Sequence, residues 1–176
     1  MRTIIISILL FATINLQSQT LVETNNWIKG KLEYNFYLAT KDNQYIYRNY
    51  HQKLHFDYNN KILTITFQGT DKNILYRKIE IPISKLNPNG FIIKKIYYEE
   101  NYIDDARVEY ELQFQCRNEE RLIKCYTKNG PTNEDSVISI RIPGTVFDDY
   151  GPEFEKRLKK ALSHFVILCG GKKEVF

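Results

Sequence analysis

A nine-residue segment in the middle of the chain alternates strictly between apolar and polar side chains. It runs from Val108 to Cys116, every even-numbered residue is apolar, and the polar residues between them are Glu109, Glu111, Gln113 and Gln115. Because successive side chains of a β-strand point to opposite faces, this pattern predicts a strand with one buried face and one face in water. Such strands are typical of antiparallel sheets, so we expect the fold to be built around one.

Shorter segments with the same period lie on both sides of it. Leu63–Phe67, Ile79–Ile83 and Ile138–Ile142 alternate in this way, and stretches rich in Asn, Asp and Gly separate the candidate strands. We expect seven strands, near residues 45–58, 61–68, 74–83, 91–98, 107–117, 121–128 and 136–142. The gaps are too short for crossover helices, so the pattern predicts a meander of antiparallel hairpins. Asn59-Asn60 suits a tight turn between the first two strands, because Asn tolerates a positive φ.

Helical patterns lie at both ends of this strand-rich region. Thr20 and Glu23 have the spacing of a capping box, and residues 21–35 predict an amphipathic helix. A second amphipathic helix is expected after Gly151-Pro152, and Gly170-Gly171 should end it in a left-handed conformation. Its apolar stripe consists of Phe154, Leu158, Ala161, Leu162, Phe165 and Cys169. The stripe must cover other apolar side chains, and an open end of a curled sheet is the obvious candidate.

Seven antiparallel strands followed by one C-terminal amphipathic helix resemble the element order of a pleckstrin-homology-like domain. The resemblance covers residues 45–169, and it implies a curled sheet or barrel that the last helix caps at one end. The segment 156–171, with Ala-Leu-Ser-His-Phe and Leu-Cys-Gly-Gly, also resembles the ending of small uncharacterised exported bacterial proteins. We therefore expect a single domain over residues 19–176, of the α+β class and mainly β, with an additional N-terminal helix.

The first residues have the pattern of a secretory leader. Met1-Arg2-Thr3 is short and basic, Ile4–Ala12 is apolar, and polar residues return before Ser18. The apolar run is shorter than the roughly 20 residues that a membrane-spanning helix needs. We expect residues 1–18 to be a signal peptide and the mature protein to be periplasmic or extracellular, without a transmembrane segment. A net charge of +4 over the whole chain is too small to predict nucleic acid as a partner.

Thirteen tyrosines offer the best candidates for a binding surface. Five of them gather in the first and fourth predicted strands and the loop that follows, namely Tyr45, Tyr47, Tyr97, Tyr98 and Tyr102. Exposed tyrosines favour contacts with proteins or sugars, because each offers a large area at a small entropic cost. An AT-rich genome would also enrich tyrosine without any such role.

These tyrosines predict a non-enzymatic binding or accessory module that contacts a protein or a glycan. Two other functions stay open. The curled sheet could carry a small apolar ligand in its interior, or the chain could be a hydrolase whose catalytic groups converge from distant loops. The sequence contains no Gly-rich phosphate loop, no Gly-x-Ser-x-Gly, no Cys-x-x-Cys and no His-Glu-x-x-His, so no cofactor or catalytic residue is predicted.

Three weaker features complete the search for binding residues. His51 and His55 would share one face of a strand about 13 Å apart, which is too far for one metal ion. The acidic loop 99–105 has oxygen ligands that calcium prefers but lacks EF-hand spacing, so a solvated loop is the better interpretation. The last helix has a basic face that either keeps the protein in solution or docks on an anionic lipid or polymer. That face consists of Lys156, Arg157, Lys159 and Lys160.

Three cysteines are an odd number for an exported protein. If a hairpin is centred between Glu120 and Arg121, Cys116 and Cys125 face each other and can form a cross-strand disulfide. A register shift of one residue would put them on opposite faces. Cys169 would then be a free thiol in the core, and its pairing with one of the strand cysteines is the alternative.

Overall fold

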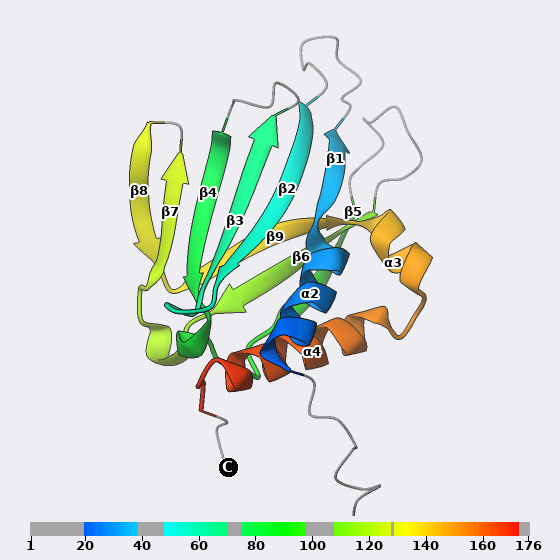
Figure 1. Ribbon diagram of the computed structural model, residues 1–176. Helices are drawn as coiled ribbons and strands as arrows, with labels where there is room; N and C mark the ends of the chain where they lie inside the picture. Colours follow the sequence, from blue (N-terminus) through cyan, green and yellow to red (C-terminus); the bar gives the residue numbers. More distant parts are fainter. Residues whose placement is uncertain (1–19, 39–47, 70–74, 98–107, 128, 173–176) are drawn as a thin grey trace, which may run out of the picture.

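The chain folds into two antiparallel sheets and a set of helices at one end of them (Figure 1). The computed structural model describes residues 20–38, 48–69, 75–97, 108–127 and 129–172. The elements are α2 (Leu21–Leu32), β1 (Tyr34–Leu38), β2 (Arg48–Asp57), β3 (Ile62–Gly69), β4 (Leu75–Pro82), η1 (Ile83–Lys85), β5 (Ile92–Tyr97), β6 (Val108–Gln115), η2 (Arg117–Glu119), β7 (Ile123–Thr127), β8 (Gly130–Asp135), β9 (Val137–Pro143), α3 (Gly144–Tyr150) and α4 (Phe154–Leu168). The predicted α+β class, mainly β, is confirmed.

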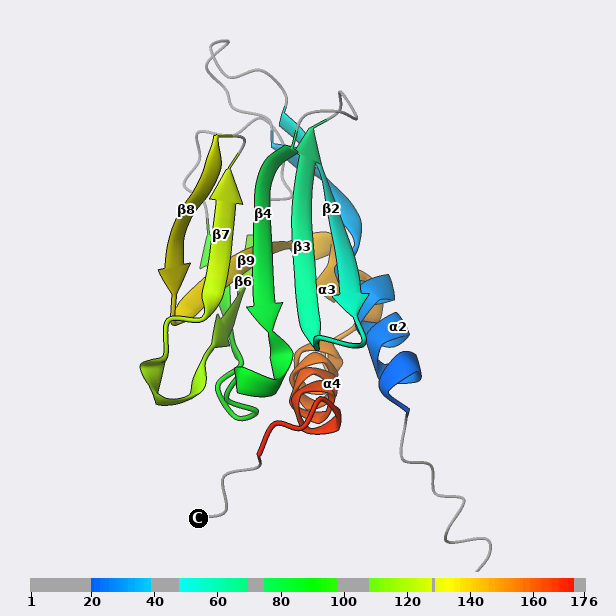
Figure 2. The same ribbon diagram turned by 60° about the vertical axis from the view of Figure 1, so that its left-hand side comes forward.

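The division of the strands between two sheets differs from the predicted arrangement. The larger sheet has six strands in the order β1-β2-β3-β4-β7-β8, and the smaller has three in the order β5-β6-β9. The smaller sheet lies behind the larger one (Figures 1 and 2). Each sheet ends in edge strands, so the described strands form neither a closed barrel nor one seven-stranded sheet.

The predicted meander is correct from β2 to β4 and again for the β5–β6 pair, and it is wrong for the other connections after β4. β4 pairs next with β7, and β6 pairs with β5 and β9. Pro82 ends β4, and η1 then carries the chain into the smaller sheet. The chain returns at Cys116, which forms an isolated bridge with Leu86 just before η2. The expected hairpin between the strands 107–117 and 121–128 therefore does not form, because its two strands belong to different sheets.

One hydrophobic core fills the space between the two sheets. The larger sheet contributes the buried side chains of Leu54, Phe56, Leu63, Ile65, Ile79, Ile81, Ile123 and Cys125. The smaller sheet contributes those of Ile93, Leu112, Phe114, Ile138, Ile140 and Ile142. On each strand these residues are two apart, as the alternating pattern predicts. Burial of each large aliphatic or aromatic side chain stabilises the fold by about 1.5–3 kcal/mol.

The turn between β2 and β3 is held by an aspartate. The carboxylate of Asp57 accepts hydrogen bonds from the backbone N–H groups of Asn59 (2.8 Å) and Asn60 (3.0 Å). These bonds, that of the Asn60 backbone first, lower the pKa of Asp57. The positive φ that was expected at the Asn pair occurs instead at Lys61, where φ is 57°.

The N-terminal helix forms where the capping box predicts it. The Thr20 hydroxyl accepts from the backbone N–H of Glu23, and the Glu23 carboxylate accepts from the backbone N–H of Thr20 at 2.8 Å. The helix ends at Leu32, three residues earlier than expected, because the chain continues as β1. Gln52 of β2 donates to the Leu32 carbonyl at 2.7 Å, and the β2 backbone donates to the Glu33 carboxylate, so α2 is fixed to the larger sheet.

Removal of the Thr20 hydroxyl is expected to weaken this helix. T20A should lower the free energy of unfolding by about 1 kcal/mol, since the substitution removes the acceptor for one of the first N–H groups of α2. T20S keeps that acceptor and should stay close to the wild type. Urea unfolding followed by circular dichroism measures both, and equal losses in T20A and T20S would contradict this role of the cap.

The C-terminal helix closes one end of the space between the sheets, as predicted. Its residues Phe154, Leu158, Leu162, Phe165 and Val166 are buried, and the Phe165 ring lies 4.8 Å from the ring of Phe56. Figure 2 shows α4 below the ends of the strands of the larger sheet. At its end, Gly170 has a φ of 88° and donates to Ile167, while Gly171 donates to Val166, which is a Schellman motif. None of the described helices has the length and apolar character needed to cross a bilayer.

Candidate functional site

The outer face of the larger sheet is open. Because alternate residues of its strands point into the core, the residues between them face away from it, and none of the described helices lies over this face (Figure 2). The half-buried or exposed residues on its central strands include Lys53, His55, Thr64, Thr66, Lys78, Glu80, Lys124 and Tyr126. This surface carries closely spaced polar side chains on the backbone of paired strands.

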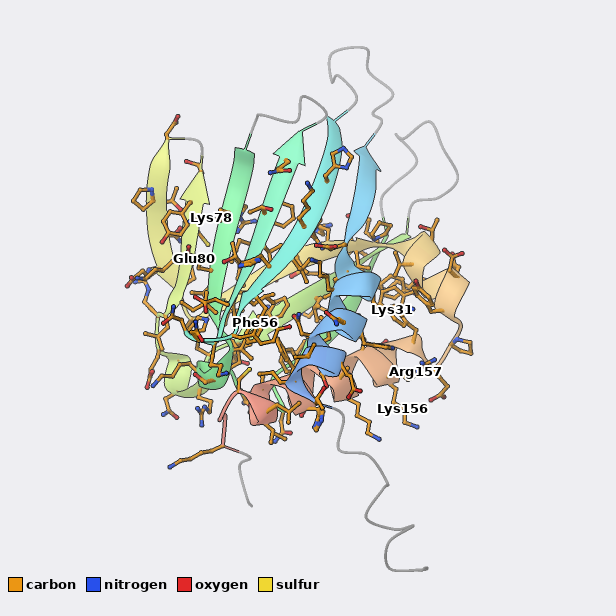
Figure 3. The ribbon with its side chains drawn as sticks, in the orientation of Figure 1. Lys31, Phe56, Lys78, Glu80, Lys156 and Arg157 are labelled. Atoms are coloured by element: carbon orange, nitrogen blue, oxygen red, sulfur yellow. The ribbon has the colours of Figure 1, made fainter. Side chains whose placement is uncertain are left out.

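Three of these side chains form a cluster on β4 and β7. Lys78 and Tyr126 are register partners in the two strands, and Glu80 follows two residues after Lys78 on the same face (Figure 3). The Lys78 ammonium donates to one Glu80 carboxylate oxygen at 2.8 Å, and the Tyr126 hydroxyl donates to the other at 2.9 Å. The ammonium also lies 4.1 Å from the centre of the Tyr126 ring. Each member thus fixes the other two.

The charges of the cluster shift its pKa values in opposite directions. Burial raises the pKa of Glu80. The hydrogen bonds from Lys78 and Tyr126 and the charge of Lys124 together lower it by more, so the pKa lies below its usual value. The hydrogen bond to Glu80 raises the pKa of the Tyr126 hydroxyl, because ionisation would put two negative charges side by side. At neutral pH the carboxylate is ionised and the phenol is neutral.

The substitution Y126F is expected to destabilise the protein most near neutral pH. A lowered carboxyl pKa stabilises the folded state above the unfolded value of about 4.3, and a raised tyrosine pKa stabilises it below about 10. The difference in unfolding free energy between wild type and Y126F should therefore be largest between about pH 5 and pH 9. It should shrink as the pH falls through the pKa of Glu80 or rises through that of Tyr126. Urea titrations at a series of pH values measure this difference, and a pH-independent difference would contradict the Tyr126–Glu80 bond.

A shallow hollow of about 240 Å³ lies beside the cluster. Its lining residues come from β3, β4, η1, β7 and the segment before β7, and they are Ile62, Glu80, Pro82, Lys85, Leu122 and Lys124. Ile62 and Pro82 are register partners, as are Glu80 and Lys124, so the sheet itself fixes most of the lining. Ile62, Pro82 and Leu122 provide an apolar surface, and the exposed lysines Lys85 and Lys124 place positive charge at its rim.

The predicted tyrosine surface falls largely outside the described residues. Tyr45, Tyr47, Tyr98 and Tyr102 are not among them, and of Tyr97 only the backbone is described, as the last residue of β5. β2, which follows Tyr45 and Tyr47, and β5, which ends at Tyr97, belong to different sheets. The proposed contact through these five tyrosines therefore stays a prediction. The acidic loop 99–105 also lies outside the described residues.

The cysteines are three buried free thiols, and no disulfide forms between Cys116 and Cys125. Cys116 forms a backbone β-bridge with Leu86, whereas Cys125 lies in the larger sheet, in register with Ile79 of β4 and Asn133 of β8. The expected register would require a hairpin that does not exist. Cys169 is buried at the end of the α4 stripe, so its alternative pairing with a strand cysteine is also not formed.

The histidines and the basic helix face are placed as their patterns predict. His51 and His55 lie on one face of β2, since the intervening Gln52 and Leu54 are buried. Within the described part of the chain, no group of three or more His, Cys, Asp or Glu side chains could hold a metal ion. On α4, Lys156 pairs with Glu153 at 3.5 Å and Lys159 pairs with Glu155 at 2.7 Å, so part of the basic face is neutralised by its own helix.

The cluster and the hollow were not predicted from the sequence. The alternation of residues 74–83 is sufficient to place Lys78 and Glu80 on the outer face, because Ile79 and Ile81 take the inner one. Nothing in that pattern shows that β7 is the neighbouring strand. Comparisons of the chain with protein-family models, with curated proteins and with solved structures found no match.

Proposed function

We propose that this chain is a non-catalytic binding module, exported by its leader 1–18, that docks a protein partner on the outer face of the larger sheet. The observation that carries the proposal is the hollow beside the Lys78–Glu80–Tyr126 cluster, on a face that no described helix covers. A protein surface that is open, fixed in geometry and partly apolar is typical of an interaction site.

The dimensions and charge of the hollow favour a protein segment as the occupant. Its volume of about 240 Å³ is below the range of roughly 300–1,000 Å³ for small-molecule sites, but it accommodates a single aliphatic side chain. The carboxylate of Glu80 is paired with Lys78, and the exposed lysines Lys85 and Lys124 add further positive charge to the lining. We therefore propose a partner segment that carries an aliphatic residue next to an Asp or Glu.

The other proposed functions have less support. A carrier would need space in the interior, and the described interior between the sheets is filled by core side chains. A hydrolase would need carboxyl groups with shifted pKa values that converge on one site. Among the described residues, the carboxyl groups with shifted pKa values lie apart in a helix cap (Glu23), a turn (Asp57) and the cluster (Glu80). The helix at one end of two packed sheets supports the further proposal that the fold is pleckstrin-homology-like.

Capture of a partner by variants of the hollow tests the proposed function. The mature chain is immobilised and exposed to envelope extract of the source cells, together with the variants K85E and L122D and the control K94E. Lys94 is an exposed lysine of β5 in the smaller sheet, so it matches the charge change at a different place. We expect the wild type and K94E to retain the same protein, and K85E and L122D to lose it.

Circular dichroism and thermal unfolding confirm that each variant is folded. This matters most for L122D, since Leu122 packs against the core, whereas Lys85 is exposed and K85E should fold normally. Retention of the partner by K85E, or its loss from K94E to the same extent, would contradict docking at the hollow.

A further inference from the structure

A second cluster of aromatic and basic side chains lies where three helices meet. Trp27 and Lys31 come from α2, Tyr150 from α3 and Arg157 from α4; together they are the Trp27 corner (Figure 3, which labels Lys31 and Arg157). The Lys31 ammonium lies 3.5 Å from the centre of the Tyr150 ring and 5.9 Å from that of Trp27. The Arg157 guanidinium also lies 5.9 Å from the centre of the Trp27 ring. Cations and rings therefore alternate.

The cations of this corner face rings rather than carboxylates. The acidic residues at the start of α4 form ion pairs with lysines of the same helix, Glu153 with Lys156 and Glu155 with Lys159. On α2, Lys29 pairs with Glu33. Among the described residues, no ion pair involves Lys31 or Arg157, so both retain hydrogen-bond donors for an external anion.

The shape of the corner restricts the kind of anion. Trp27 is half-buried with its ring centre 6.4 Å from that of Phe154, and Tyr150 is 40% exposed with its ring centre 5.0 Å from the same residue. The accessible part of this corner therefore combines the Tyr150 ring with the cations that lie over the two rings. A membrane-binding helix needs a wide exposed apolar face, whereas Ile28 of α2 and Leu158 and Leu162 of α4 are buried in the core. Aromatic rings beside cations that have no carboxylate partner suit a sugar ring that carries a carboxylate.

We propose that the Trp27 corner binds an acidic saccharide of the uronic acid class. On binding, the Lys31 ammonium leaves the Tyr150 ring for the carboxylate of the sugar, which Arg157 also contacts, and the sugar ring takes its place against the tyrosine. This site lies on the helices and is separate from the hollow on the outer face of the larger sheet. It does not depend on the proposed protein partner, so either can fail without the other.

The single tryptophan of the chain makes this proposal directly measurable, because Trp27 is the only indole that fluoresces. Trigalacturonic acid is titrated into the mature protein, with neutral maltotriose as the matched control. We expect a saturable change in fluorescence with the acidic trisaccharide, weaker binding at higher salt, and no change with the neutral one. No saturable change with the acidic sugar, or an equal change with both sugars, would overturn the proposal.

Variants show whether the two cations make the contact. K31Q and R157Q should each weaken binding by about tenfold, the effect of losing one charge-assisted hydrogen bond, and K94Q should leave it unchanged. Thermal unfolding of each variant separates lost binding from lost folding. Unchanged affinity in both K31Q and R157Q would overturn the proposal. A fluorescence change with vesicles of anionic phospholipid and none with the trisaccharide would overturn it in favour of a lipid surface.

Discussion

Replacement of Phe165 by alanine is expected to lower the free energy of unfolding by about 3–5 kcal/mol. The side chain is 1% exposed, lies on the buried stripe of α4, and contacts Phe56 of β2 through its ring. F165A removes that ring and leaves a cavity where the helix meets the larger sheet. The loss is large because the surrounding side chains come from rigid elements that cannot collapse into the space.

Ile167, on the same helix two residues later, provides the matched control. It is 38% exposed, so I167A should cost less than about 1 kcal/mol. Urea unfolding of both variants, followed by circular dichroism, gives the two free energies. Similar losses in F165A and I167A would mean that α4 does not pack its predicted stripe against the sheets.

Cys169 in the folded protein is expected to react with a thiol reagent roughly a hundredfold more slowly at pH 8 than in the urea-unfolded chain. Burial raises the pKa of its thiol to about 11, which the charge of Lys61 offsets only in part. Only the thiolate reacts, and each unit of pKa above the pH reduces its fraction about tenfold. Burial likewise raises the pKa of Cys116, so that thiol should also be protected.

Mass spectrometry of the labelled peptides measures the rate at each cysteine separately. In urea without reductant, all three cysteines should be labelled, because the fold leaves each of them as a free thiol. Fewer than three labelled cysteines in the purified chain of residues 19–176 would reveal a disulfide and contradict this arrangement of the strands. Rapid labelling of Cys169 in the folded protein would show that the end of α4 is not packed.

Much of the secondary structure follows from local patterns in the sequence. Alternation places the strands around Leu112 and Ile140 correctly, because the burial of one face requires a period of two. The capping box at Thr20 and the glycines after Cys169 place the helix ends for a similar reason, since each satisfies backbone groups through neighbouring residues.

The pairing of the strands could not be predicted in the same way. A period of two shows which face of a strand is buried but not which strand lies beside it. No pattern in the neighbouring residues therefore predicts the β4–β7 and β6–β9 pairs. β8 was also missed, because its residues Gly130–Asp135 are polar and lie at an edge where most side chains remain in water. α3 was not predicted, because it has only seven residues and ends directly before Gly151-Pro152, where the longer helix was expected to begin.

The candidate site depends on this missing information. Glu80 can be assigned to the outer face from the pattern of its own strand, but Tyr126 is brought to it only through the pairing of β4 with β7. The lining of the hollow adds Lys85 from η1 and Leu122 from a turn, and these come together only after the chain has crossed between the sheets twice.

Site-specific photo-crosslinking is the most direct test of docking on the outer face. A benzophenone-bearing amino acid replaces Lys124 at the rim of the hollow, or Lys94 on the smaller sheet as the control, and the chain of residues 19–176 is irradiated in envelope extract. We expect one discrete crosslinked protein from position 124 and none from position 94. Crosslinking from position 94 alone, or the same products from both positions, would contradict the docking of a partner on the larger sheet.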